Sequence, residues 1–109
     1  MDKVFKVAKS DIKNIATGMG SCIATDLITV NGHSVGYMYR EESSFDTDSG
    51  WRFMAGSETQ DYMDVSNNSA IYDINTIANY DNDIVSLLDS PVGSAYERST
   101  NGIFQVTEY

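Results

Sequence analysis

The sequence predicts a single α+β domain with a largely antiparallel sheet of about five strands and three or four short helices. Two Asn-Gly pairs, Asn31-Gly32 and Asn101-Gly102, lie between stretches rich in β-branched and aromatic residues, a pattern typical of antiparallel hairpins. Short stretches with helical spacing separate the strands, without the strand–helix alternation of a parallel nucleotide-binding sheet. At 109 residues, the chain is expected to form one domain over residues 1–109 with one hydrophobic core.

The first elements expected along the chain are a short helix and a hairpin. Ser10 is a suitable N-cap for a helix over residues 10–16, and Gly18 follows the end of that helix. Residues 22–40 then form a hairpin, because Asn31-Gly32 supplies the positive φ angles of a tight type I′ turn.

The rest of the chain alternates short strands with short helices. A polar loop over residues 43–50 precedes these elements. They are a strand over 51–55, a helix over 57–64 begun by capping-box spacing, a strand over 70–72, a helix over 73–78 capped by Asp73, a helix from 81 or 83 to 88, and a closing hairpin of residues 95–98 with 103–107.

Charge is unevenly distributed and argues against two classes of partner. The net charge is −9, all four lysines fall within residues 1–13, and residues 14–109 carry fourteen acids against three arginines, a net of −11. Such a surface repels nucleic acid phosphates and anionic membranes but attracts a basic protein. The same acidity also serves solubility alone, so both interpretations stand.

The sequence contains no recognisable catalytic or metal-binding set. Cys22 and His33, the single cysteine and histidine, lie far apart along the expected hairpin, and a buried Cys22 is the simpler interpretation. The segment 46–50 resembles the start of a calcium loop, but its register places Trp51 where the turn glycine is needed. We therefore expect no enzyme activity, no cofactor and no metal.

The chain also lacks an obvious export or membrane signal. No stretch approaches the roughly 20 apolar residues of a membrane span, and the first residues lack the apolar core of a signal peptide. A single cysteine fits a reducing compartment. The expected location is the cytoplasm.

The densest charge cluster predicts a partner-binding surface. Acids between residues 41 and 64 face one cation, Arg52, and alternate with aromatic residues, as in many strong protein contacts. Seven residues are the predicted partner-binding set: Glu41, Glu42, Phe45, Asp46, Asp48, Trp51 and Arg52. In the alternative interpretation the aromatic residues are core and the acids are a solvated rim. A different alternative is an enzyme or small-ligand site in a cleft near Trp51, Arg40 and Arg98.

Four runs of sequence in this order resemble a bacterial family of predicted immunity proteins of polymorphic toxin systems, first described as a domain of unknown function. The runs are residues 36–42 (GYMYREE), 48–53 (DSGWRF), 72–79 (YDINTIAN) and 87–98 (LLDSPVGSAYER), and the resemblance covers about residues 20–98. It implies a small α+β protein that binds and neutralises a protein toxin. The lysine-bearing N-terminal segment lies outside this resemblance.

Overall fold

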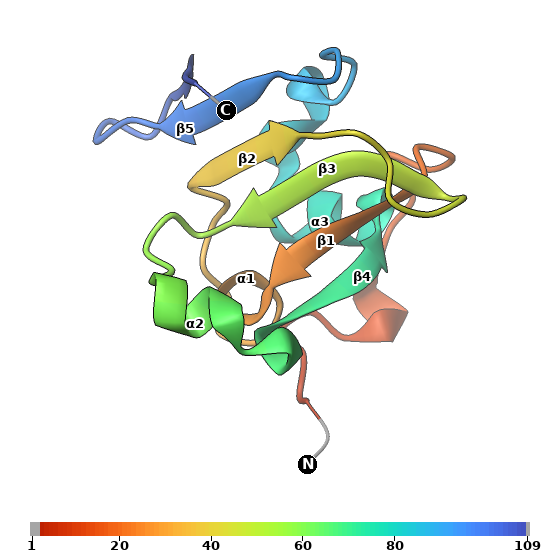
Figure 1. The fold of residues 1–109 in the computed structure, drawn as a ribbon. Helices are drawn as coiled ribbons and strands as arrows, with labels where there is room; N and C mark the ends of the chain where they lie inside the picture. The colour runs from red at the N-terminus through yellow and green to blue at the C-terminus, as the bar shows by residue number, and fades with distance from the viewer. Residues whose placement is uncertain (1–2, 109) are drawn as a thin grey trace.

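The computed structural model describes residues 3–108, which form a mixed sheet with helices packed on one side (Figure 1). Six strands are arranged in the order β4-β1-β3-β2-β5-β6. They are β1 (Ser21–Thr25), β2 (Tyr37–Arg40), β3 (Asp48–Met54), β4 (Ser69–Asp73), β5 (Ala95–Arg98) and β6 (Phe104–Val106). Strand β1 runs parallel to β3, and every other neighbouring pair is antiparallel. The predicted α+β class with a mostly antiparallel sheet is confirmed.

The helices are short, and several begin where the sequence predicts. They are η1 (Lys9–Asp11), α1 (Asp26–Thr29), α2 (Gln60–Asp64), η2 (Ser66–Asn68), α3 (Ile74–Tyr80) and η3 (Asn82–Leu87). Asp73 caps α3 and Asp81 caps η3, each by accepting a hydrogen bond from the backbone two residues on. Helix α2 is capped by Thr59 rather than by Ser57, since the Thr59 hydroxyl accepts from the Tyr62 amide.

The hairpin predicted around Asn31-Gly32 is wrong. Residues 26–29 form α1 instead, and Gly32, with φ of 80°, ends that turn by donating its amide to the Ile28 carbonyl. Asn-Gly suits both a type I′ turn and the end of a helix, because both require positive φ. Strands β1 and β2 therefore do not pair, and β3 lies between them. The hairpin at residues 95–106 is confirmed, with Gly102 at φ of 86° in its turn.

The helix predicted over residues 10–16 is also wrong beyond the single turn of η1. Asn75 Oδ1 accepts from the amides of Ile15 and Ala16 at 2.7 and 2.8 Å, and Asn75 Nδ2 donates to the Lys13 carbonyl. Asn79 accepts from the Lys13 amide and donates to the same carbonyl. These two side chains of α3 bond to backbone N–H and C=O groups that would otherwise pair within a helix. Residues 13–16 are therefore held as an irregular strap across α3.

The hydrophobic core lies between the sheet and the helices behind it. Figure 1 views the sheet from the other side, with α3 behind β1 and β3. Cross-strand partners share a face of the sheet, so the register places one set of side chains toward the helices: Cys22, Ala24, Met38, Trp51, Phe53 and Tyr96. Ile74, Ile77, Ile84 and Leu88 of the helical layer are buried against the sheet. The opposite face is not covered by α3 or η3, and it is called the open face below; α2 and η2 lie at its lower edge in Figure 1.

Candidate protein-binding surface

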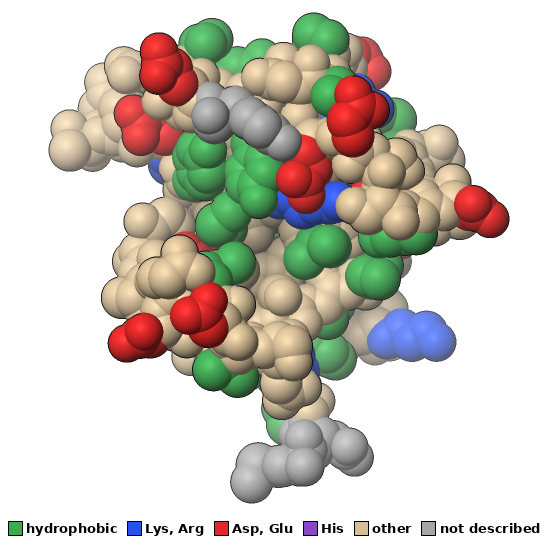
Figure 2. All heavy atoms as spheres, viewed as in Figure 1, with side chains coloured by type: hydrophobic (Ala, Val, Ile, Leu, Met, Phe, Trp, Pro, Cys, Tyr) green, Lys and Arg blue, Asp and Glu red, His purple; other side chains and the backbone are tan. Residues whose placement is uncertain are grey.

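The open face presents two rows of side chains that cross the sheet. The first row is Ile71, Ile23, Arg52, Tyr39 and Ala95, from β4, β1, β3, β2 and β5. The second row is Met54, Tyr37, Glu97 and Gln105, from β3, β2, β5 and β6. Figure 2 shows hydrophobic side chains gathered over this face, with a basic side chain and an adjoining acidic side chain among them and other acidic side chains toward the margin.

Aromatic and aliphatic side chains give this face its apolar area. The rings of Tyr37 and Tyr39 lie 5.5 Å apart between centroids, tilted by 37°. Both tyrosines, Met54 and Ile23 are half-buried, and Ile71 is 58% exposed. Tyrosine is enriched in protein interfaces because its ring supplies contact area while its hydroxyl stays hydrated.

A buried ion-pair network stands in the middle of the open face. The Arg52 guanidinium donates to both Asp48 oxygens, at 2.9 and 2.8 Å, and its Nε donates to Glu41 Oε2 at 2.6 Å. The hydrogen bonds from Arg52 hold the pKa of the Asp48 carboxyl well below its usual range, and those to Asp48 raise the pKa of Arg52. Asp48 also accepts from the amides of Ser44 and Gly50. The network thus fixes the start of β3 and the loop before it.

Gly50 makes this arrangement possible through its backbone. Its φ is 91°, and a Cβ there would lie 2.0 Å from the Glu41 carbonyl oxygen. The register between β1 and β3 shifts at this point, because Ser21 pairs with Asp48 while Ile23 pairs with Arg52. The resulting bulge brings Asp48 and Arg52 together although they are four residues apart in one strand.

The seven predicted partner-binding residues lie in β3 and in the loop before it, but on different sides of the sheet and unequally exposed. Glu42 and Asp46 are exposed, and Glu41 and Phe45 are partly exposed. The other three, Asp48, Trp51 and Arg52, are 8%, 1% and 4% exposed. Trp51 lies on the helical side, where its Nε1 donates to the Leu88 carbonyl and its ring stacks with Phe53. A direct partner contact by this set stays a prediction.

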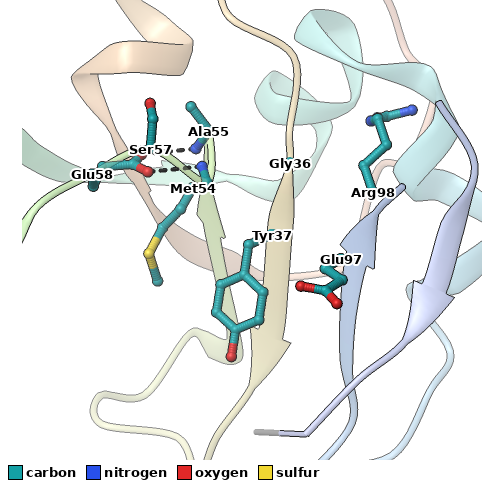
Figure 3. Close-up of a pocket in the computed structure, with 9 residues that line it drawn as sticks. Gly36, Tyr37, Met54, Ala55, Ser57, Glu58, Glu97 and Arg98 are labelled. Atoms are coloured by element: carbon teal, nitrogen blue, oxygen red, sulfur yellow. Dashed lines mark hydrogen bonds between the residues drawn. The ribbon is translucent and has the colours of Figure 1, made fainter. Parts of the chain in front are cut away.

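A pocket of about 450 Å³ opens at one end of the second row (Figure 3). It is lined by Gly36, Tyr37, Met54, Ala55, Gly56, Ser57, Glu58, Glu97 and Arg98. Glu58 fixes the loop after β3 by accepting hydrogen bonds from the Ala55 and Gly56 amides and the Thr25 hydroxyl. Although burial opposes ionisation, these hydrogen bonds together lower the pKa of Glu58. Glu58 therefore carries negative charge at neutral pH.

The structure does not bring Trp51, Arg40 and Arg98, the residues of the alternative site, together. The Arg40 guanidinium lies 5.8 Å from the Trp51 ring centroid and donates to the carbonyls of Ser49 and Ser90. Arg98 lies at the opposite end of the β2–β5 pair and donates to Asp81, Asp83 and the carbonyls of Val35 and Gly102. Both arginines are thus committed to structural contacts.

No catalytic or metal-binding cluster stands out in the described part of the chain. Burial raises the pKa of the fully buried Cys22 thiol far above its usual range, which keeps the thiol protonated and unreactive. His33 is exposed just after α1. Residues 3–108 contain no group of three or more His, Cys, Asp or Glu side chains placed to hold a metal ion. Nor do they include a helix of the length and apolar character that a membrane crossing requires.

Sequence reasoning missed the open-face residues Tyr37, Tyr39, Met54, Ile71 and Glu97. Tyr37-Met38-Tyr39 alternates around the buried Met38, and Trp51–Met54 alternates around buried aromatic rings. Assigning Met38 and Phe53 to the core would have identified the intervening residues as the opposite face. The signal is ambiguous, because both sets contain large apolar side chains.

The comparisons with known proteins identify a family for this chain. Neither the curated proteins nor the solved structures gave a match. Residues 22–108 match the family described as the immunity protein Imm33 domain. The match runs from the second residue of β1 through β6 and starts after the strap across α3. Because it spans most of the 109 residues, this chain belongs to the immunity protein Imm33 domain family.

Proposed function

We propose that this chain binds a protein toxin through the open face of its sheet and neutralises it by that contact, without catalysis. The observation that supports this most is the face itself, where Tyr37, Tyr39, Met54 and Ile71 remain accessible on a rigid sheet. Membership in an immunity protein family makes a toxin the natural class of partner. A stable one-to-one complex of this kind buries about 1,200–2,000 Å².

The charge of the chain favours a toxin with a basic surface. Residues 14–109 carry a net charge of −11, and Glu42 and Asp46 are exposed beside the open face. An acidic margin raises the rate of encounter with a basic partner, while desolvated aromatic side chains slow the escape of the bound partner. Charge and aromatic contact should therefore affect different rate constants. The cytoplasm is part of this proposal as the compartment in which the two proteins meet.

The test is surface-capture kinetics against the toxin domain encoded beside this gene, at low and high salt. The double variant Glu42→Lys with Asp46→Lys should slow association and flatten its salt dependence. Glu41 and Asp48 are left unchanged because they pair with Arg52, and a lysine at either position would place a like charge against its guanidinium. Association as fast as that of the wild type at every salt concentration would remove the acidic margin from the docking surface.

Tyr37→Ala tests the apolar part of the face, and Phe5→Ala is its matched control. Phe5 is 44% exposed but packs against Tyr72, whose side chain faces the helical side of the sheet. We expect Tyr37→Ala to speed dissociation at least tenfold and Phe5→Ala to leave it unchanged. Equal effects of the two variants would contradict the assignment of the open face.

A non-catalytic role also has a direct test. Cys22→Ala and His33→Ala, if folded, should still protect cells from the toxin, because the buried thiol is unreactive and His33 is a lone exposed imidazole. Loss of protection in either folded variant would overturn the non-catalytic proposal.

A further inference from the structure

The pocket beside Tyr37 differs from the rest of the open face in its chemistry. Met54, Tyr37 and Glu97 are successive cross-strand partners on β3, β2 and β5, so their side chains stand in one row. Directly paired residues have Cβ atoms about 5 Å apart. Figure 3 shows the Tyr37 ring and the Glu97 carboxylate next to each other on the same side of the sheet.

Glu97 is the carboxylate in this pocket that is free to receive a ligand. It is exposed, and within residues 3–108 the structure gives its side chain no hydrogen bond or ion pair. Glu58, at the other side of the pocket, already accepts three hydrogen bonds but adds a second negative charge.

Arg98 does not neutralise the pocket, although it contributes to the lining. Its guanidinium is turned toward η3, where Nη2 pairs with Asp81 and Nη1 pairs with Asp83 at 3.0 Å. The pocket is therefore acidic. A phosphate or carboxylate ligand would meet repulsion there. Residues 3–108 contain no group of three or more His, Cys, Asp or Glu side chains placed to hold a metal ion.

We infer that this pocket binds a basic side chain of the protein partner, and that arginine fits it best. A planar guanidinium stacks on an aromatic ring and forms two parallel hydrogen bonds to one carboxylate. Tyr37 supplies the ring, Met54 supplies an apolar wall, and Glu97 supplies the carboxylate. The inference rests on the proposed function and deepens it by naming the chemistry of one anchor on the toxin.

The first experiment needs no toxin. Nα-acetyl-arginine amide is titrated into the ¹⁵N-labelled protein, with Nα-acetyl-citrulline amide as the neutral analogue of the same shape. We expect amide shifts at Gly36, Ala55, Gly56 and Glu97, with a Kd on the order of millimolar as befits one ion pair and one stacked ring. Glu97→Gln should abolish these shifts. Equal shifts with the citrulline compound, or shifts confined to other parts of the molecule, would overturn the inference.

The second experiment uses the complex with the toxin domain. Glu97→Gln should weaken binding at least tenfold, because it leaves a partner cation buried without its counter-charge. Asp89→Asn is the matched control, since it removes the same charge from an exposed residue after η3. Both variants should melt within a few degrees of the wild type, as expected for surface substitutions.

The outcomes separate the inference from the function on which it rests. If the complex forms but Glu97→Gln binds no worse than Asp89→Asn, the arginine pocket is wrong and toxin binding stands. If no complex forms, toxin binding fails, and the arginine titration alone decides whether the pocket binds a basic side chain.

Discussion

The two faces of the sheet are made by the same strands, yet they are buried to very different degrees. On the helical side, Met38, Trp51 and Phe53 are at most 1% exposed. On the open face, the neighbouring residues Tyr37 and Met54 are half-buried, and Ile71 is 58% exposed. Alternate residues along one strand therefore have different roles. Substitutions on the helical side should reduce stability, whereas those on the open face should alter binding.

Trp51→Ala should give the largest loss of stability. The substitution removes a buried indole and the hydrogen bond from its Nε1 to the Leu88 carbonyl at 3.2 Å. The free energy of unfolding should fall by about 3–5 kcal/mol. Ile71→Ala on the open face should lower it by less than about 1 kcal/mol. Urea denaturation of both variants is the measurement, and similar losses would contradict the division of roles between the faces.

Arg52 sharpens the comparison, because it points to the open face and is still buried, as is Ala95 in the same row. Asp48→Asn removes the main counter-charge of a guanidinium whose side chain is 5% exposed. Leaving that charge unpaired should cost about 3–5 kcal/mol. Glu41→Gln, at a carboxylate side chain that is 35% exposed, should cost about 1 kcal/mol or less. Equal costs in urea denaturation would show that Asp48 has no special part in holding Arg52.

The same ion pair gives the stability a pH dependence of defined sign. Arg52 holds the pKa of Asp48 below its usual range in the folded chain, and the unfolded value is about 4. The stabilisation is therefore complete above pH 4 and is lost as the pH falls through that value toward the folded pKa. The difference between wild type and Asp48→Asn should be constant from about pH 7 to 5 and shrink below about pH 4. A difference that grew on acidification would contradict this assignment.

Asn75→Ala should have a smaller effect that is confined to one region of the helical side. The variant loses the acceptor for the Ile15 and Ala16 amides and the donor to the Lys13 carbonyl. We expect a loss of about 1–3 kcal/mol and amide hydrogen exchange at residues 15 and 16 at least tenfold faster. Asn79→Ala, which affects more exposed bonds to Lys13, should have the weaker effect. Unchanged exchange in Asn75→Ala would mean that other contacts hold the strap.

Local chemistry made several elements predictable from the sequence. The caps Asp73 and Asp81 act on amides two residues away, so their helices begin where the residue pattern indicates. The turn at Asn101-Gly102 likewise closes strands only a few residues apart. Asn31-Gly32 misled because its positive φ ends α1 instead of reversing a hairpin.

The features that the sequence did not predict depend on contacts between residues far apart in the chain. The parallel pairing of β1 with β3 depends on contacts across more than 20 residues. The helix expected at residues 10–16 gives way to side chains of α3. For the candidate surface, the sequence located the acids between residues 41 and 48 but not the direction in which Trp51 points. That direction follows from which face the helices cover, and helix placement is a property of the whole fold.

The strap of residues 13–16, which Asn75 holds across α3, docks late in folding. The bonded amides of residues 15 and 16 precede Asn75 by 60 and 59 positions. During synthesis, this N-terminal segment leaves the ribosome before α3 has been made, so it waits without its partner while β1, β3 and β4 are added. Closing so long a loop is slow compared with forming a helix. The strap, which is synthesised before α3, is therefore expected to be among the last parts of the fold to dock.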